Sequence, residues 1–440
     1  MEKIFDHLTE AKKFFFADKT QLNLFIAGFL ILFCNLTFFV GRHAINMPFW
    51  DEWDITQEVT QENNWFTILT HQHNEHRIGV GLAVAKIAAY FTNWNQFFET
   101  KIISFQLLLS CLLILLLIKK IRGKITLLDL IIPLIFFNTF QDGNIIFSFQ
   151  LTFVFPLVFL CLGLASLLIK EIPIRNLLIV FFSLLAAFSS FHGLFVPLVF
   201  IAFFVLEFIK DRRQSLKIFL PTLLAEIAVI ASYFIGYKSQ LQTSLTFNFG
   251  QRFFDFLATM FSNGFFFTDR NGEWFFFSYL VLIITLIFGL IGLWNFFREH
   301  EKTLSLSIIG SLLIAYALLF NLSITVGRSA FGLGQGITTR YLTFSMLAAL
   351  GVFLIVSECK KTAGALKFLL LLFLLFNVWA FHLKDEKSIE RGSFQRQAAA
   401  ECYLVSNKNF DKCFQITPLY PSQERLEMFL PDVLKFKKGQ

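Results

Sequence analysis

Carboxylates and tryptophans alternate in one short polar segment near the start of the chain, PFWDEWD (residues 48–54). The carboxylates are Asp51, Glu52 and Asp54. Because aromatic rings exclude water, a carboxylate held beside them has a raised pKa and can accept a proton as a general base. We expect this catalytic role for Asp51, with Glu52 as its neighbour in the site.

Other roles are open for the same carboxylates. Asp54 precedes a segment that resembles a surface helix beginning at Ile55, where an aspartate caps the first turn, and we expect this of Asp54. Asp51 and Glu52 together could hold a divalent ion, although the pattern does not require a metal.

A second polar segment is HQHNEHR (residues 71–77). The spacing of its histidines matches no closed zinc site and no fourth ligand lies nearby, so we expect no bound metal. We expect a solvent-exposed loop whose side chains hydrogen-bond a polyol or a phosphate. The alternative is that these side chains are simply solvated by water. The residues assigned to substrate binding are His73, Glu75, His76 and Arg77.

Two arginines, Arg328 and Arg340, are the only charged residues in the glycine-bearing segment VGRSAFGLGQGITTRY (residues 326–341). An arginine fork near lipid headgroups can bind a phosphate in bidentate fashion, and glycines let backbone N–H groups approach it. We expect both arginines and Tyr341 to bind substrate. The alternative is that the arginines reach toward lipid headgroups without binding a substrate. Walker A and dinucleotide patterns are absent, so no cofactor is expected.

The elements that position these residues are apolar. Of 440 residues, 56% are hydrophobic and 16% charged, too few polar groups to cover a water-soluble surface. Long apolar runs predict an all-α polytopic membrane protein with about eleven transmembrane helices. The predicted spans are 22–41, 101–118, 125–140, 149–169, 176–190, 193–209, 218–237, 275–297, 303–322, 341–357 and 366–382.

The basic residues predict an orientation. With a cytoplasmic N-terminus, the cytoplasmic segments hold 19 Lys and Arg residues and the external loops 8. The positive-inside rule then gives an external C-terminus. The net charge of +7 therefore reflects the orientation of the chain in the membrane, and no nucleic-acid partner is expected. All the polar segments fall outside, in or beside external loops 42–100, 238–274 and 323–340.

Two shorter apolar stretches, 78–91 and 253–267, are predicted to be amphipathic helices at the outer membrane surface. Residues 1–382 form the predicted membrane module, and residues 383–440 a small external tail. Cys402 and Cys413 are the two cysteines of that tail, a disulfide candidate in an oxidising space. We expect the tail to pack over the mouth of the site.

The motifs PFWDEWD, HNEHR, GR followed by FG, and TRY resemble the GT-C superfamily of polyprenyl-phosphate-sugar glycosyltransferases. More narrowly, they are similar to bacterial and phage-borne glucosyltransferases that modify O-antigen. The resemblance implies that Asp51 is the catalytic acidic residue of the first loop. It also implies that Asp142, in QDGN (residues 141–144), is a second acidic residue of the site. It also implies that Arg340 and Tyr341 meet the lipid phosphate.

The function expected from this resemblance is inverting transfer of a sugar, glucose first among candidates, from a polyprenyl-phosphate donor to a periplasmic lipid-linked glycan such as O-antigen or lipopolysaccharide. The site would face the periplasm from the bacterial inner membrane. A donor synthase and a flippase are the expected companions. The alternative function is a lipid or oligosaccharide transporter, for which Glu226 inside a span is the main sign.

Overall fold

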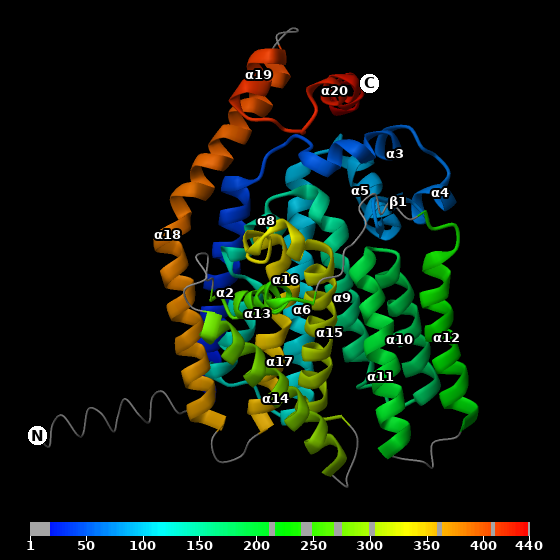
Figure 1. Cartoon of the computed structure of the whole chain (residues 1–440), viewed down its shortest axis with the longest axis vertical. Coiled ribbons are helices and arrows are strands. Elements are labelled where there is room, and N and C mark those ends of the chain that lie inside the picture. Colours follow the sequence, from blue (N-terminus) through cyan, green and yellow to red (C-terminus); the bar gives the residue numbers. More distant parts are fainter. Residues whose placement is uncertain are drawn as a thin grey trace, which may run out of the picture.

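The computed structural model describes residues 18–210, 216–238, 249–267, 275–298, 304–358, 363–405 and 410–438. Within these ranges the chain is almost wholly helical, with one two-residue hairpin formed by β1 (Gln72–His73) and β2 (His76–Arg77). The longer helices stand side by side along the vertical axis of Figure 1, and the C-terminal helices lie above them.

The α-helices are α2 (Asp18–His43), α3 (Thr56–Thr60), α4 (Trp65–Leu69), α5 (Gly79–Thr92), α6 (Gln96–Arg122), α7 (Ile131–Phe136), α8 (Asp142–Ile145), α9 (Leu151–Ser166), α10 (Ile172–Ala187), α11 (Phe195–Lys210), α12 (Leu216–Phe234), α13 (Gln251–Gly264), α14 (Phe275–Arg298), α15 (Leu306–Arg328), α16 (Leu342–Ser345), α17 (Leu347–Glu358), α18 (Ala363–Val405), α19 (Phe410–Ile416) and α20 (Gln423–Lys437). The 3-10 helices are η1 (Trp50–Ile55), η2 (Leu127–Leu130), η3 (Thr139–Gln141), η4 (Ser148–Gln150), η5 (Phe191–Leu194), η6 (Ser329–Phe331), η7 (Leu333–Gln335) and η8 (Thr339–Tyr341).

Eight helical segments among the described residues are long and apolar enough to cross a bilayer. They are Lys19–His43, Gln96–Arg122, Ser148–Ser166, Phe191–Lys210, Leu216–Phe234, Phe275–Arg298, Leu306–Phe331 and Thr339–Glu358. Each coincides with one predicted span. The chain is therefore a multi-pass, all-α membrane protein.

The three remaining predicted spans have a different form. Residues 125–140 are not one helix, because η2, α7 and η3 follow one another with breaks between them. α10 is a 16-residue helix, shorter than a typical span. Residues 366–382 belong to α18, a continuous helix of 43 residues that runs on into the predicted tail.

The predicted surface helix at 253–267 is α13, and its surroundings differ from the expectation. α13 lies across the bundle in Figure 1 and packs against α14, α15 and α16. Its residues from Phe256 to Gly264 are buried on every side, so the wetted face predicted for this stretch is limited to its first turn. The reason is that α14 covers part of the polar face: Ser278 Oγ donates to Ser262 Oγ at 3.0 Å, and the Tyr279 hydroxyl donates to Asp255 Oδ1 at 2.8 Å.

The backbones of α15 and α17 are in close contact. A Cβ on Gly310 would lie 2.5 Å from the carbonyl oxygen of Gly351, and a Cβ on Gly351 would lie 2.5 Å from that of Gly310. Two facing glycines let the backbones approach, as small residues do between membrane helices. This contact fixes α15, whose last residue is Arg328.

Charged residues inside the bundle have polar partners. Arg175 makes two hydrogen bonds to the carboxylate of Glu207, at 2.9 and 2.8 Å. Asp129 pairs with Arg122. Glu226 accepts a hydrogen bond from Ser183 Oγ at 3.1 Å. Arg175 and Arg122 therefore have carboxylate partners between helices, whereas one oxygen of Asp129 and one of Glu226 have no hydrogen-bond partner among the described residues.

The region we call the cap, residues 44–94 and 387–438, has its own hydrophobic cluster. Apolar side chains of the first loop, such as Trp53 and Trp94, pack with Leu430 and Val433 of α20. Cys402 and Cys413 are bonded to each other in a disulfide that joins α18 to α19. The tail thus shares a core with the first loop instead of folding separately.

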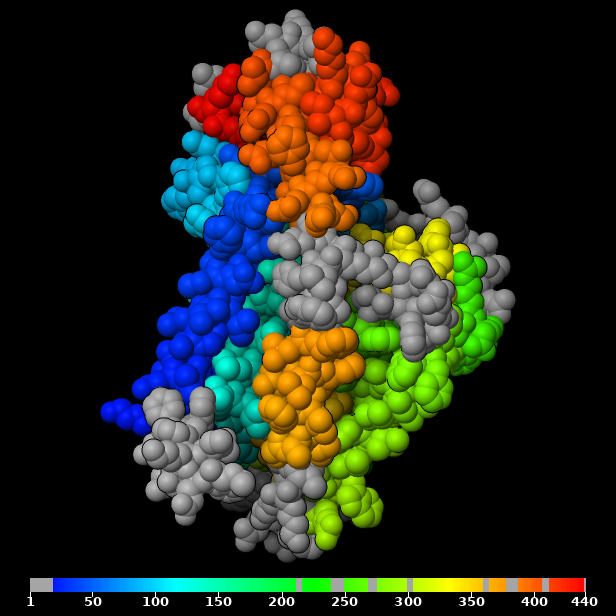
Figure 2. All heavy atoms as spheres, turned by 90° about the vertical axis from the view of Figure 1, so that its left-hand side faces the viewer, coloured from blue at the N-terminus to red at the C-terminus, as the bar shows by residue number. Residues whose placement is uncertain are grey.

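α18 joins the cap to the bundle along the face seen in Figure 2, where its orange residues rise beside the blue residues of α2. Two contacts tie the upper part of α18 to the end of α2. Arg42 pairs with Glu390 at 2.5 Å, and His43 Nδ1 lies 2.9 Å from Ser393 Oγ.

Candidate functional site

Two cavities lie where the cap meets the bundle. The inner one has a volume of about 140 Å³ and is lined by residues of the first loop, α9, η5, α15 and the 339–344 segment. The outer one has a volume of about 680 Å³. Both are lined by Asp51, Asn74, Gln150, Arg328 and Arg340, so the two cavities are continuous.

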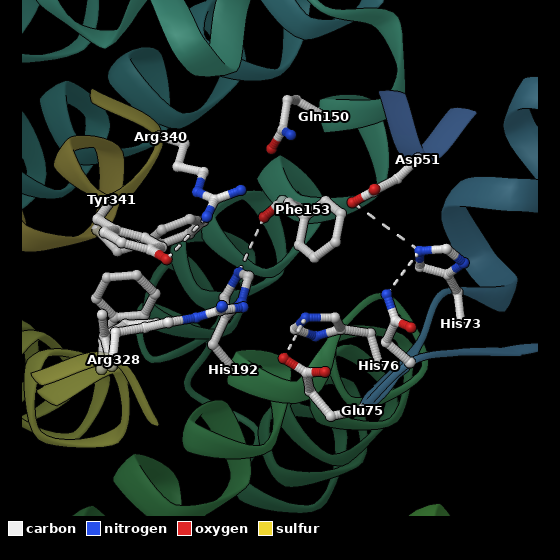
Figure 3. Close-up of a pocket in the computed structure, with 14 residues that line it drawn as sticks. Asp51, His73, Glu75, His76, Gln150, Phe153, His192, Arg328, Arg340 and Tyr341 are labelled. Carbon is white, nitrogen blue, oxygen red and sulfur yellow. Dashed lines mark hydrogen bonds and ion pairs between the residues drawn. The ribbon is translucent and has the colours of Figure 1, made fainter. Parts of the chain in front are cut away.

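Asp51 lies on one wall of the inner cavity (Figure 3). It follows Trp50, the first residue of η1. Its side chain is 48% exposed, and its carboxylate lies 4.0 Å from His73 Nε2. Burial lowers the pKa of His73, although Asp51 and Asp54 oppose that effect, so a neutral imidazole faces Asp51. A half-exposed carboxylate beside a neutral histidine can accept a proton from a bound hydroxyl.

Arg328 and Arg340 lie opposite Asp51 in Figure 3. Arg328 ends α15, and Arg340 lies in η8 with its guanidinium 5.1 Å from the ring of Tyr341. Arg340 also donates to the Tyr341 hydroxyl at 3.2 Å. Neither arginine makes a direct ion pair with a carboxylate of the described residues, although Arg328 is near enough to Glu75 to help lower the pKa of that carboxyl. Two guanidinium groups without a direct ion pair can bind an anion at a cavity.

The QDGN segment positions Arg340. Asn144 Nδ2 donates to the backbone oxygen of Arg340 at 2.6 Å and to Thr343 Oγ1 at 2.7 Å. Gly143 N–H donates to Thr339 Oγ1 at 3.2 Å, and a Cβ at Gly143 would lie 2.7 Å from that oxygen. Two polar motifs almost 200 residues apart in the chain are therefore one structural unit. Asp142 itself lines the outer cavity only.

Glu75 and His76 line the floor of the inner cavity. His76 Nδ1 accepts the backbone N–H of Phe191 at 3.1 Å, which leaves Nε2 to donate toward Glu75, 3.5 Å away. The hydrogen bond with His76 lowers the pKa of Glu75 to about 2, so this carboxylate is charged at neutral pH. Glu75 is therefore a second carboxylate at the cavity, and it stays negatively charged.

Arg77, assigned to substrate binding from the sequence, lines neither cavity. Its guanidinium donates to the carbonyl oxygens of Tyr233 at 2.9 Å, Ile235 at 2.5 Å and Thr70 at 2.5 Å. Tyr233 and Ile235 lie at the C-terminal end of α12, where a cation stabilises the helix dipole. Arg77 therefore holds the first loop against α12.

Glu52, placed beside Asp51 in the predicted site, faces the other way. It is 1% exposed and accepts hydrogen bonds from Ser148 Oγ at 2.6 Å and from Gln96 Nε2 at 3.5 Å. Burial is the largest influence on this carboxyl and, despite those hydrogen bonds, raises its pKa to about 7. Glu52 lines neither cavity, so it stabilises the Asp51 turn from its buried side.

Lys437 of α20 completes the buried network around Glu52. Its amine donates to Asn46 Oδ1 at 2.9 Å, to the Trp94 carbonyl at 2.7 Å and to Gln96 Oε1 at 2.6 Å. Burial lowers its pKa to about 8, and the nearby carboxyls of Glu52 and Glu99 partly offset this effect. A lysine from the tail thus offsets the negative charge beneath the Asp51 turn.

Asp54 does not cap a helix as expected. Its Oδ1 accepts a hydrogen bond from the Tyr420 hydroxyl at 2.7 Å and lies 3.3 Å from Arg425 Nη2. Trp50 N–H also donates to the carbonyl oxygen of Leu419 at 2.8 Å. The tail therefore forms hydrogen bonds to the Asp51 turn on both sides of Asp51, at Trp50 and at Asp54.

The sequence analysis missed several residues of the inner cavity, among them Gln150, Phe153 and His192. His192 is 6% exposed. Its Nε2 lies 3.0 Å from the carbonyl oxygen of Phe153, and its ring packs 4.2 Å from that of Phe344. A lone histidine between two apolar runs was the available signal.

One group among the described residues has the composition of a metal site: Asp51, Asp54 and His73, whose ligand atoms all lie within 4.8 Å of one another. His71, by contrast, lies 3.6 Å from Glu58, away from this group. Two carboxylates and an imidazole suit a divalent cation such as Zn²⁺ or Mn²⁺. The site as we use it below needs no ion.

No protein-family model, curated protein or solved structure matches this chain. Function must accordingly be inferred from the two cavities and the residues that line them.

Proposed function

We propose that the protein is a membrane glycosyltransferase of the GT-C type. It transfers a hexose, glucose being the first to test, from a polyprenyl phosphate to a hydroxyl of a lipid-linked glycan. The observation that carries this proposal is the pairing across one cavity of a half-exposed carboxylate, Asp51, with two arginines that lack carboxylate partners among the described residues.

The proposed reaction is a single displacement with inversion. The acceptor oxygen attacks the anomeric carbon of the donor sugar while Asp51 takes the acceptor proton. The bond between the anomeric carbon and the phosphate oxygen breaks, and the polyprenyl phosphate leaves with the electron pair. Arg328 and Arg340 offset the charge that develops on the leaving phosphate. No metal or nucleotide is needed in this scheme.

The orientation we propose places the cap and both cavities on the periplasmic side of the bacterial inner membrane, with eleven crossings. The distribution of Lys and Arg supports it, because these residues are concentrated in the segments predicted to be cytoplasmic. A synthase that loads the polyprenyl phosphate and a flippase that delivers it are the partners this orientation requires.

A transporter is the competing class, and the partners of the buried charges argue against it. A translocation path is usually lined by ionisable groups at mid-membrane. Here Glu226, the main sign of a transporter, accepts a hydrogen bond from Ser183 and lines neither cavity, and the two cavities that carry Arg328 and Arg340 lie at one end of the bundle.

The deciding experiment uses purified protein in nanodiscs with polyprenyl-phosphate-[¹⁴C]glucose and a lipid-linked O-antigen acceptor. We expect label in the acceptor and free polyprenyl phosphate in equal amounts. In parallel, proteoliposomes with a fluorescent polyprenyl phosphate test transport. Movement of the lipid across the bilayer without any transfer of label would establish the transporter and refute the enzyme.

A further inference from the structure

The outer cavity contains a feature that the proposed reaction does not use, the side chain of Trp50. Trp50 lines this cavity and is 50% exposed. Its φ is +52°, a left-handed conformation that a bulky residue rarely adopts. The hydrogen bond from its N–H to Leu419 holds the backbone in this form. A strained backbone that keeps a large indole at a cavity marks a position where the side chain has a use.

Aromatic rings cover one wall of the outer cavity. Phe49 stacks on Phe147 with centroids 4.6 Å apart and an interplanar angle of 12°. The guanidinium of Arg396 lies over both rings, 5.7 Å from Phe49 and 5.1 Å from Phe147. Phe149 lines the same cavity. This wall is therefore preorganised by packing rather than formed by mobile side chains.

Hydrogen-bonding side chains also line the outer cavity: Asp142, Gln335, Thr338 and Thr339. Carboxylate, amide and hydroxyl groups pair with sugar hydroxyls, and the flat face of an aromatic ring packs against the C–H face of a pyranose. A lining that combines aromatic rings with hydrogen-bonding groups has the chemistry of a carbohydrate site, whereas a lipid chain would need an apolar lining.

We propose that the outer cavity is the acceptor subsite and that it binds a pyranose ring of the glycan, with Trp50 as its stacking platform. This inference rests on the proposed glycosyl transfer. The outer cavity is nearly five times as large as the inner one, and Asp51 lines both. A hydroxyl of a sugar in the outer cavity can therefore face Asp51 while the donor sugar and phosphate occupy the inner cavity.

Trp65 supplies a matched control for Trp50. It lies in the same loop, is 48% exposed, and lines neither cavity. A tryptophan whose only role is to lie in the membrane interface would behave like Trp65. The test compares Trp50→Ala, Trp50→Phe and Trp65→Ala.

Binding is measured first, by saturation-transfer NMR on protein in nanodiscs, with the methyl glycosides of glucose, galactose, rhamnose and N-acetylglucosamine as probes. We expect at least one glycoside to bind the wild type, Trp50→Ala to weaken that binding about tenfold, and Trp50→Phe and Trp65→Ala to retain it, since stacking on one ring contributes on the order of this factor. Absence of binding by all four probes, or equal binding by Trp50→Ala and the wild type, would overturn the subsite.

Kinetics then separate this inference from the proposed function. In the transfer assay, Trp50→Ala should raise the KM for the acceptor about tenfold and leave the KM for the donor unchanged. Transfer with an unchanged acceptor KM would reject the subsite and keep the enzyme. Glycoside binding that depends on Trp50, in a protein with no transfer, would keep the sugar site and reject the enzyme.

Discussion

Asp51 and Glu52 are neighbours in the chain, yet their carboxylates lie in opposite environments. Asp51 is half exposed at a cavity, opposite two arginines that it does not touch. Glu52 is buried in a network closed by Ser148, Gln96 and Lys437. The cavity side presents Asp51 and two arginines that form no direct ion pair with each other, whereas the buried side surrounds Glu52 with the protein's own hydrogen-bonding groups. The two sides of this 3-10 turn therefore differ in role: one side faces a cavity that can bind a ligand, and the other stabilises the fold.

The largest contrast should come from removing each carboxylate. We expect Asp51→Asn to lower kcat about 10²- to 10⁴-fold, the usual contribution of a general base. Glu52→Gln keeps the shape of the support and an acceptor for Ser148 Oγ, and it should retain kcat within about tenfold of the wild type, since it removes no reacting group. The measurement is the initial rate of polyprenyl phosphate release. Equal losses in the two variants would abolish the distinction between the two sides.

The arginines come next. Arg340→Ala removes charged hydrogen bonds worth about 1.5–3 kcal/mol, and we expect the KM for the donor to rise on the order of tenfold to a hundredfold. Arg122→Ala and Arg425→Ala are not suitable controls because they break the pairs with Asp129 and Asp54. Arg391→Ala, which removes an exposed arginine of α18, is the control. An unchanged donor KM in Arg340→Ala would contradict donor binding by this residue and favour the alternative that it reaches toward lipid headgroups.

The buried side is tested through stability. Lys437→Met leaves the carboxyls of Glu52 and Glu99 without their cation, and we expect a loss of about 1–3 kcal/mol, seen as a lower Tm in detergent. Lys435→Met, an exposed lysine of the same helix, is the control and should have little effect. Restoration of the Tm in Lys437→Met/Glu52→Gln would show that the charge is what matters. A double variant no more stable than Lys437→Met would contradict the network.

The smallest expected effect is on the pH dependence of stability. The pKa of Glu52 is about 7 in the folded protein and 4.5 as its ordinary value. The folded state then binds more protons than the unfolded state between these values, so the free energy of unfolding falls as pH rises from about 4.5 to 7. The slope from one such group is at most about 1.4 kcal/mol per pH unit. Glu52→Gln should flatten it in Tm measurements across this range, and an unchanged slope would assign it to other groups.

Sequence patterns were sufficient where a property depends on one segment at a time. Runs of apolar residues located eight helices because burial in lipid requires length and hydrophobicity alone. The broken segment at 125–140 could not be distinguished from a span by composition. The burial of α13 beyond its first turn depends on α14, α15 and α16, which no local pattern reveals.

The site was predictable in the identity of its charged residues and less so in their roles. Polar groups are rare in this chain, so Asp51, Arg328 and Arg340 could be selected before their meeting at one cavity was known. Arg77 and Glu52 were selected for the same reason and lie outside both cavities. Their partners, the end of α12 and Lys437 of α20, are remote in sequence, and the direction in which a side chain points from a short turn depends on such partners.

The contacts between the tail and the first loop also impose an order in time. Leu419 and Lys437 are synthesised after every apolar helix, whereas Trp50 and Glu52 follow soon after the first of these helices. During synthesis, therefore, the Asp51 turn lacks the hydrogen bond from Trp50 to Leu419 and the cation beneath Glu52. The turn reaches its final form only when the end of the chain folds back onto its beginning, so the same contacts that support the site also make it the last part of the protein to assemble.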